Sequence, residues 1–213
     1  SIYIVTTDPP ISAAMRTPNM RSQSGWAAAE ENATRIFANI GFDQDSITGI
    51  FLVQDQENHI SVLRQGIYSG ATQRALAVYA EHASQNSARS LVASGQYPGY
   101  VYLITDYLDI NFMAPLGKII IEIAANRFVN SDYLTGVYPG AAVYLSDLSG
   151  GILFGDTALP LGNAITGNIP TSGEFTNTEA GEYYYRTSRL GIYNLRVNVF
   201  VPQNQIFAAV NDT

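Results

Sequence analysis

The spacing of apolar residues predicts two helices in the first half of the chain. Residues 25–40 place apolar side chains at helical intervals, and Gly41 follows as a stop signal. Residues 72–94 carry a second apolar face with the same period, and Gly95 ends it. Between the first strand-like run and the first helix, residues 9–24 contain three prolines and no apolar period, so this segment is predicted to be a loop.

Runs of β-branched and aromatic residues predict the strands. They occupy residues 1–7, 47–53, 60–68, 100–105, 183–185 and 195–201. The run at residues 100–105 is apolar almost throughout, as in a central strand with both faces covered. Residues 119–128 fit either a helix or a strand, and we favour a helix. Helices mixed with strands first, and strands alone later, indicate an α+β fold.

Composition narrows the function classes. The chain has 213 residues, 46% of them hydrophobic, and a net charge of -7, which together indicate a folded domain with little capacity to bind nucleic acid. It has no cysteine, its two histidines are far apart in sequence, and no run approaches the ~18 apolar residues of a membrane helix. We therefore expect no metal site and no transmembrane segment. Numbering from Ser1 fits a processed chain that is secreted or periplasmic.

Several short segments occur in an order that is found in a known toxin family. After the run at residues 2–5, they are 36–37, 41–42, 66–71, 100–105, 110–112, 130–134 and 136–139. Taken together, residues 1–145 resemble the ADP-ribosyltransferase domain of toxin A subunits of the cholera and pertussis type. The scarcity of lysine, with Lys118 alone among 11 basic residues, is also a trait of such subunits.

The resemblance implies an ADP-ribosyltransferase-like split β-sandwich with flanking helices. Residues 1–145 would form its core, and residues 146–213 would be a β-rich C-terminal part of the same domain. It also implies NAD as the cofactor, a host protein as the substrate and a B-subunit oligomer as the partner. Because there is no cysteine, that partner would be held non-covalently.

The positions that carry catalysis in that family are largely replaced here. Ile4 stands where the family has an arginine that binds phosphate, and a Ser-Thr-Ser strand is replaced by Ser69, Gly70 and Ala71. The Glu-x-Glu motif is replaced by Asn130-Ser131-Asp132, in which Asp132 keeps a carboxylate on a shorter stem. By resemblance, the catalytic positions are Ser69, Asn130 and Asp132, and the cofactor-binding positions are Ile4, Gly70 and Ala71. We expect weak or absent NAD binding and an impaired enzyme.

Other interpretations of the same residues stay open. Arg16 or Arg21 could supply the phosphate contact, and Glu122 could supply the carboxylate. Asp132 also fits a helix cap, and Ser69 before Gly70 fits an ordinary turn. The leading hypothesis is a toxin A-subunit-like protein that acts through binding or assembly. The alternatives are an active mono-ADP-ribosyltransferase and an unrelated adhesin or lectin-like module.

Overall fold

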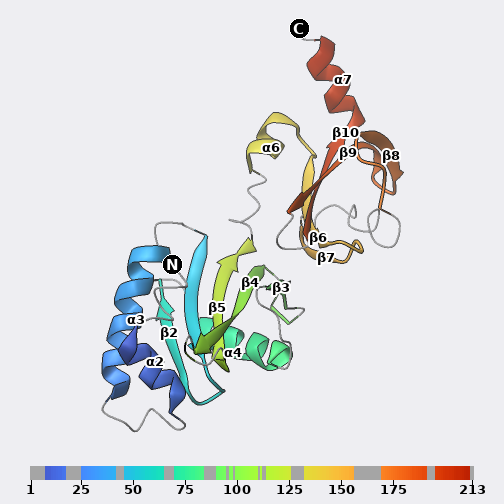
Figure 1. Ribbon diagram of the computed structural model, residues 1–213. Coiled ribbons are helices and arrows are strands. Elements are labelled where there is room, and N and C mark those ends of the chain that lie inside the picture. The colour runs from blue at the N-terminus through green and yellow to red at the C-terminus, as the bar shows by residue number, and fades with distance from the viewer. Residues whose placement is uncertain are drawn as a thin grey trace. The chain divides into compact units, whose positions relative to one another are not determined.

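The protein consists of two compact units, Ser1–Ala124 and Ala125–Thr213. The computed structural model describes residues 8–17, 25–41, 46–64, 70–83, 90–94, 96–97, 99–109, 111, 114–125, 132–155, 169–190 and 195–211. Each unit is built around one five-stranded antiparallel sheet (Figure 1). The α+β class expected from the sequence is confirmed. The division expected after residue 145 lies within strand β6 (Ala142–Asp147) of the second unit.

The first unit has three described helices and five described strands. The helices are α2 (Pro9–Arg16), α3 (Gly25–Gly41) and α4 (Ala71–His82). The strands are β1 (Ile47–Val53), β2 (His59–Leu63), β3 (Ser90–Ala93), β4 (Tyr100–Asp109) and β5 (Ala114–Ala124), in the sheet order β2-β1-β5-β4-β3.

Helices cover both faces of this first sheet (Figure 1). On one face, α2 and α3 pack over a core that contains Trp26, Phe37 and Tyr107. On the other, which we call the α4 face, helix α4 packs over Phe51 and Ile120. Because both faces are buried, the central strands are apolar on both sides.

Helix α2 occupies residues that were predicted to be a loop, and that prediction was wrong. Asp8 caps the helix by accepting a hydrogen bond from the Ile11 backbone N–H at 3.1 Å, and Pro9 and Pro10 fill the first turn. Proline suits this position because the first N–H groups of a helix have no partner within it. The prolines therefore mark the start of a helix and not a break.

Strand β5 corrects a second expectation, a helix at residues 119–128. Its residues alternate between the two cores, with Ile119 packed against α2 and α3 and Ile120 packed against α4. A strand buried on both faces reads as a continuous apolar run, which periodicity alone does not separate from a helix.

The long helix predicted at residues 72–94 is also partly wrong. Helix α4 ends at His82, and residues 90–93 form strand β3. The helix predicted at residues 25–40 is confirmed by α3, and the run at residues 100–105 is confirmed as a buried strand by β4. β4 pairs with β5 on one side and with β3 on the other. The strand predicted at residues 1–7 lies outside the described residues.

The second unit contains α6 (Asp132–Val137), β6, β7 (Ile152–Gly155), β8 (Glu174–Thr178), β9 (Gly181–Leu190), β10 (Leu195–Pro202) and α7 (Gln203–Asn211). Its sheet has the order β7-β6-β10-β9-β8. Phe200 lies at the centre of its core, against the rings of Tyr144, Tyr183 and Tyr185. The strands predicted at residues 183–185 and 195–201 are confirmed. No helix in the described part of the chain is long and apolar enough to cross a membrane.

Gly117 in β5 holds a position that only glycine fits. Its φ is +154°, and a Cβ atom there would lie 2.4 Å from the Val53 carbonyl oxygen. We expect Gly117→Ala to lower the free energy of unfolding by about 2 kcal/mol, measured by urea denaturation. Gly25→Ala is the control, because a Cβ atom at Gly25 meets nothing within 4 Å. Equal free energies of unfolding for the two variants would show that a side chain at residue 117 causes no strain.

Candidate functional site

A cluster of polar side chains lies on the α4 face of the first sheet. Its centre is Glu122 of β5, which is fully buried, and the side chains around it come from α4, β1 and β4. We call this group the polar cluster; its members are Thr48, Arg74, Tyr100, Tyr102 and Glu122.

Four side-chain hydrogen bonds converge on the Glu122 carboxylate. Arg74 donates from Nε to Oε2 at 2.8 Å and from Nη2 to Oε1 at 2.7 Å, so the two groups form a bidentate pair. The Tyr102 hydroxyl donates to Oε2 at 3.1 Å, and the Thr48 hydroxyl donates to Oε1 at 2.6 Å. Both oxygens are thus engaged, and the carboxylate orients Arg74.

Two residues that donate hydrogen bonds to Glu122, Arg74 and Tyr102, have raised pKa values. The hydrogen bond from Arg74 to Glu122 raises the pKa of the arginine, so its guanidinium stays protonated. Burial raises the pKa of Tyr102, and the neighbouring Glu122 carboxylate raises it further, so its hydroxyl stays a hydrogen-bond donor. Arg74 also lies 4.1 Å from the centre of the Tyr100 ring, in a cation–π contact, and 12% of its side chain is exposed.

A second ion pair lies further along the same face. Lys118 Nζ donates to Asp106 Oδ1 at 2.8 Å, and the two residues are directly opposite each other on β5 and β4. Glu122 and Tyr102 are opposite each other four residues along these strands, about 13 Å away at the usual rise of a strand. The α4 face thus carries paired charges of both signs among apolar side chains.

The functional groups of the polar cluster are one guanidinium, one carboxylate, two phenols and one threonine hydroxyl. None of the polar-cluster residues is a histidine or a cysteine, and the only carboxylate among them already accepts four side-chain hydrogen bonds. Among the described residues, no group of three histidine, aspartate or glutamate side chains could hold a metal ion.

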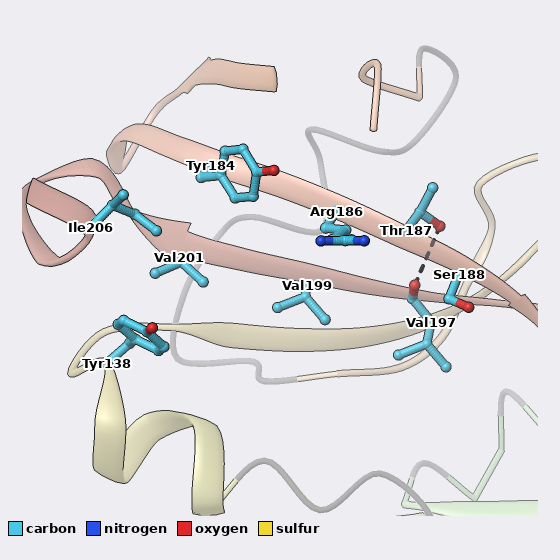
Figure 2. A pocket seen from close by; sticks show the side chains of 9 residues that line it. All are labelled: Tyr138, Tyr184, Arg186, Thr187, Ser188, Val197, Val199, Val201 and Ile206. Carbon is cyan, nitrogen blue, oxygen red and sulfur yellow. Dashed lines mark hydrogen bonds between the residues drawn. The ribbon is translucent and has the colours of Figure 1, made fainter. Parts of the chain in front are cut away.

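The second unit contains a pocket of its own, on the sheet face away from Phe200. Its volume is about 330 Å³, and Figure 2 shows the nine side chains that line it. They are Tyr138, Tyr184, Arg186, Thr187, Ser188, Val197, Val199, Val201 and Ile206.

Three of the six site residues predicted from the sequence are described by the structure, and none of these three is a member of the polar cluster or of the pocket lining. Gly70 lies before helix α4 with a φ of +86°, and Ala71 is its first residue and is fully buried against the sheet. Asp132 is exposed at the start of α6 in the second unit, which fits the helix-end interpretation. The remaining three positions, Ile4, Ser69 and Asn130, lie outside the described residues. Their roles, and weak or absent NAD binding, stay predictions.

Two of the three alternative residues, Arg16 and Glu122, have described positions, and Arg21 lies outside the described residues. Arg16 Nε donates to Asp109 Oδ2 at 2.6 Å, which ties α2 to the end of β4. Glu122 is the centre of the polar cluster. Sequence reasoning missed Arg74, Tyr102 and Thr48; the one available signal was the presence of Lys118 and Glu122 within an apolar run of β5.

Comparison with known proteins finds matches to the fold but none to the sequence. No family model matches the sequence, and no curated protein matches it significantly. Solved structures do match. The extracellular domain of the histidine kinase rpHK1S-Z16 aligns with a TM-score of 0.55 at 14% identity, over 93% of this chain and 84% of that one.

Two further matches span nearly the whole chain. The ligand-binding domain of the Pseudomonas aeruginosa amino acid chemoreceptor PctB, solved with L-Arg, aligns with a TM-score of 0.54 at 11% identity, over 99% of this chain and 83% of that one. The Vibrio cholerae histidine kinase DctB sensor domain aligns with a TM-score of 0.51 at 11% identity, over 94% and 87%. The fold is similar to that of extracellular sensor domains.

The sensor-domain likeness overturns the resemblance to toxin A subunits. That resemblance was assembled from segments of two to six residues, whereas the sensor-domain fold accounts for 93–99% of the chain. The predicted toxin A-subunit function, its transferase alternative and the B-subunit partner are therefore wrong. Short runs such as residues 100–105 are apolar because the strand is buried on both faces, and many unrelated sheets share that pattern.

Proposed function

We propose that this chain is an extracytoplasmic sensor domain of a membrane receptor, a histidine kinase or a chemoreceptor, and that it binds a small charged molecule on the α4 face. The observation that supports this most is the sensor-domain likeness across both units. Two α+β units in succession, each with one antiparallel sheet, correspond to the double Cache arrangement. An extracytoplasmic location agrees with the expectation of a secreted or periplasmic chain.

The polar cluster favours the first unit as the place of binding. Withdrawing an arginine and a carboxylate from water costs several kcal/mol each, and apolar residues would stabilise a sheet as well or better. A buried pair such as Arg74 and Glu122 therefore suggests a role beyond stability. Arg74 and Tyr100 remain partly accessible, so they can contact a ligand while Glu122 holds the guanidinium in place.

The charges on this face suggest the ligand class. Both signs are present, in the Arg74–Glu122 and Lys118–Asp106 pairs, and Ile104 and Ile120 lie between them. A small zwitterion, with an ammonium and a carboxylate group a few ångströms apart, has the charges to exchange partners with the Arg74–Glu122 pair, whose guanidinium side chain is partly exposed. The PctB domain was solved with L-Arg, a molecule of this class, which is consistent with the proposal.

A thermal-shift screen of the purified chain tests this function. We expect one group of zwitterionic compounds, among amino acids, short organic acids, amines and sugars, to raise the unfolding temperature, because a ligand that binds only the folded state stabilises it by about 2.7 kcal/mol at 100 times its Kd. Arg74→Lys keeps the charge but loses the planar fork, so we expect binding measured by calorimetry to weaken about tenfold.

The matched control is Arg35→Lys on α3, an exposed residue bonded only to Asn32 at 3.5 Å among the described contacts. It should leave binding unchanged. If no compound class shifts the unfolding temperature, the sensor proposal fails. If a ligand binds equally well to Arg74→Lys, the assignment of the polar cluster fails while the sensor proposal stands.

A further inference from the structure

The side chains that line the pocket of the second unit are arranged by the pairing of strands β9 and β10. In the pairing of β9 with β10, Tyr184 is opposite Val201, Arg186 is opposite Val199, and Ser188 is opposite Val197. These residues alternate with the buried ring residues of the same strands, so they share the face that Phe200 leaves open. The register therefore sets one charged position in the middle of a row of valines.

The two ends of this row differ in polarity. Figure 2 shows Ile206 and Tyr138 beside Val201 at one end, and Ser188 beside Val197 at the other. Val201 is almost fully buried, and the surfaces that line the pocket are mainly apolar. From Arg186 toward Val201 and Ile206, a ligand would thus meet only hydrocarbon and aromatic side chains.

Among the described residues that line the pocket, Arg186 is the only charged one. Within the described parts of the chain, no carboxylate forms an ion pair with it. Arginine binds carboxylates with two parallel hydrogen bonds, so a guanidinium that pairs with no described acid is available to a carboxylate ligand. An apolar amine would instead place its ammonium group next to the Arg186 guanidinium, which carries the same charge.

From these observations we propose that the second unit binds an amphiphilic carboxylate, with its head group on Arg186 and its hydrocarbon tail on the valine row. The volume of about 330 Å³ has room for roughly ten non-hydrogen atoms, if each takes the ~30 Å³ of a water molecule in the liquid. The site thus fits a medium-chain carboxylic acid. This binding is separate from that of the first unit and involves none of the polar cluster.

Calorimetric titration of the purified chain with octanoate, octylamine and acetate tests this site. We expect octanoate to bind, octylamine to bind at least about tenfold more weakly because of its charge, and acetate to bind too weakly to measure because it lacks a tail. Arg186→Gln should weaken octanoate about fivefold, a modest factor because the guanidinium is partly in water.

Two further variants complete the test. Arg189→Gln removes the same charge from an exposed position of β9 outside the pocket, and it should leave octanoate binding unchanged. Val199→Phe fills the middle of the row of valines and should abolish octanoate binding. The variant should still show a thermal unfolding transition, which establishes that it is folded.

The following binding results would each overturn the proposal. They are the absence of octanoate binding, equal octanoate affinity of Arg186→Gln and the unmodified chain, and equal affinity for octanoate and octylamine. Self-association that Val199→Phe abolishes, seen by sedimentation without octanoate binding, would show that a second copy of the chain covers this face and would also refute it. The polar cluster is intact in all these variants, so failure here leaves the sensor proposal untouched.

Discussion

Replacement of Glu122 by glutamine is expected to lower the free energy of unfolding of the first unit by about 3 kcal/mol, the usual cost of breaking a buried ion pair on one side. Glutamine has nearly the same shape, but it removes the charge that faces Arg74. It also places an amide donor where one oxygen now accepts from Arg74, Tyr102 or Thr48. Urea denaturation would measure the loss of stability. Hydrogen exchange would locate this loss, which we expect in α4, β4 and β5.

The control for this variant is Glu57→Gln, which makes the same change at an exposed residue of the β1–β2 turn. It should alter stability by less than about 0.5 kcal/mol. The double variant Arg74→Leu with Glu122→Leu should recover much of the loss, since apolar pairs can replace buried ion pairs. If Glu122→Gln is no less stable than Glu57→Gln, the carboxylate does not anchor α4 to the sheet.

Replacement of Phe200 by alanine is expected to cost the second unit about 3–5 kcal/mol, the range for deleting a buried phenylalanine ring. Phe200 is fully buried, and its ring centre lies 5.0 Å from that of Tyr185 and 5.9 Å from that of Tyr144. Its removal leaves a cavity among tyrosines whose rings it now contacts. Hydrogen exchange should show faster opening of β6, β9 and β10.

Phe207→Ala is the matched control, because this phenylalanine lies on α7 with 53% of its surface exposed and contacts Phe175. We expect it to cost less than about 1 kcal/mol. Equal losses for the two variants would mean that the core of the second unit is not centred on Phe200.

The sequence predicted elements well where one periodicity dominated. Helix α3 has a clear apolar stripe and ends at a glycine, Gly41, and β4 is an apolar run of strand length. The predictions failed where one sequence pattern is compatible with two different structures. The apolar run of β5 is continuous because both faces of the strand are covered, and Pro9 and Pro10 start a helix because Asp8 caps it.

The candidate site was harder to predict because its parts are distant in sequence. Arg74 and Glu122 are separated by 48 positions, and they meet only because β5 lies between β1 and β4 under α4. Nothing local in the sequence around Arg74 marks it as the partner of a buried carboxylate. The toxin resemblance went wrong for a related reason, since its matched segments report strand character and turns rather than a three-dimensional site.

Hydrogen exchange of the first unit with and without bound ligand tests the central claim most directly. The compound that raises the unfolding temperature most in the screen should slow exchange in α4 and in the parts of β4 and β5 that carry Tyr100, Tyr102 and Glu122. Arg74→Lys should weaken this protection, whereas Arg35→Lys should leave it unchanged. Protection confined to residues 125–213, or none in α4 at saturating ligand, would contradict the assignment of the α4 face as the sensory site.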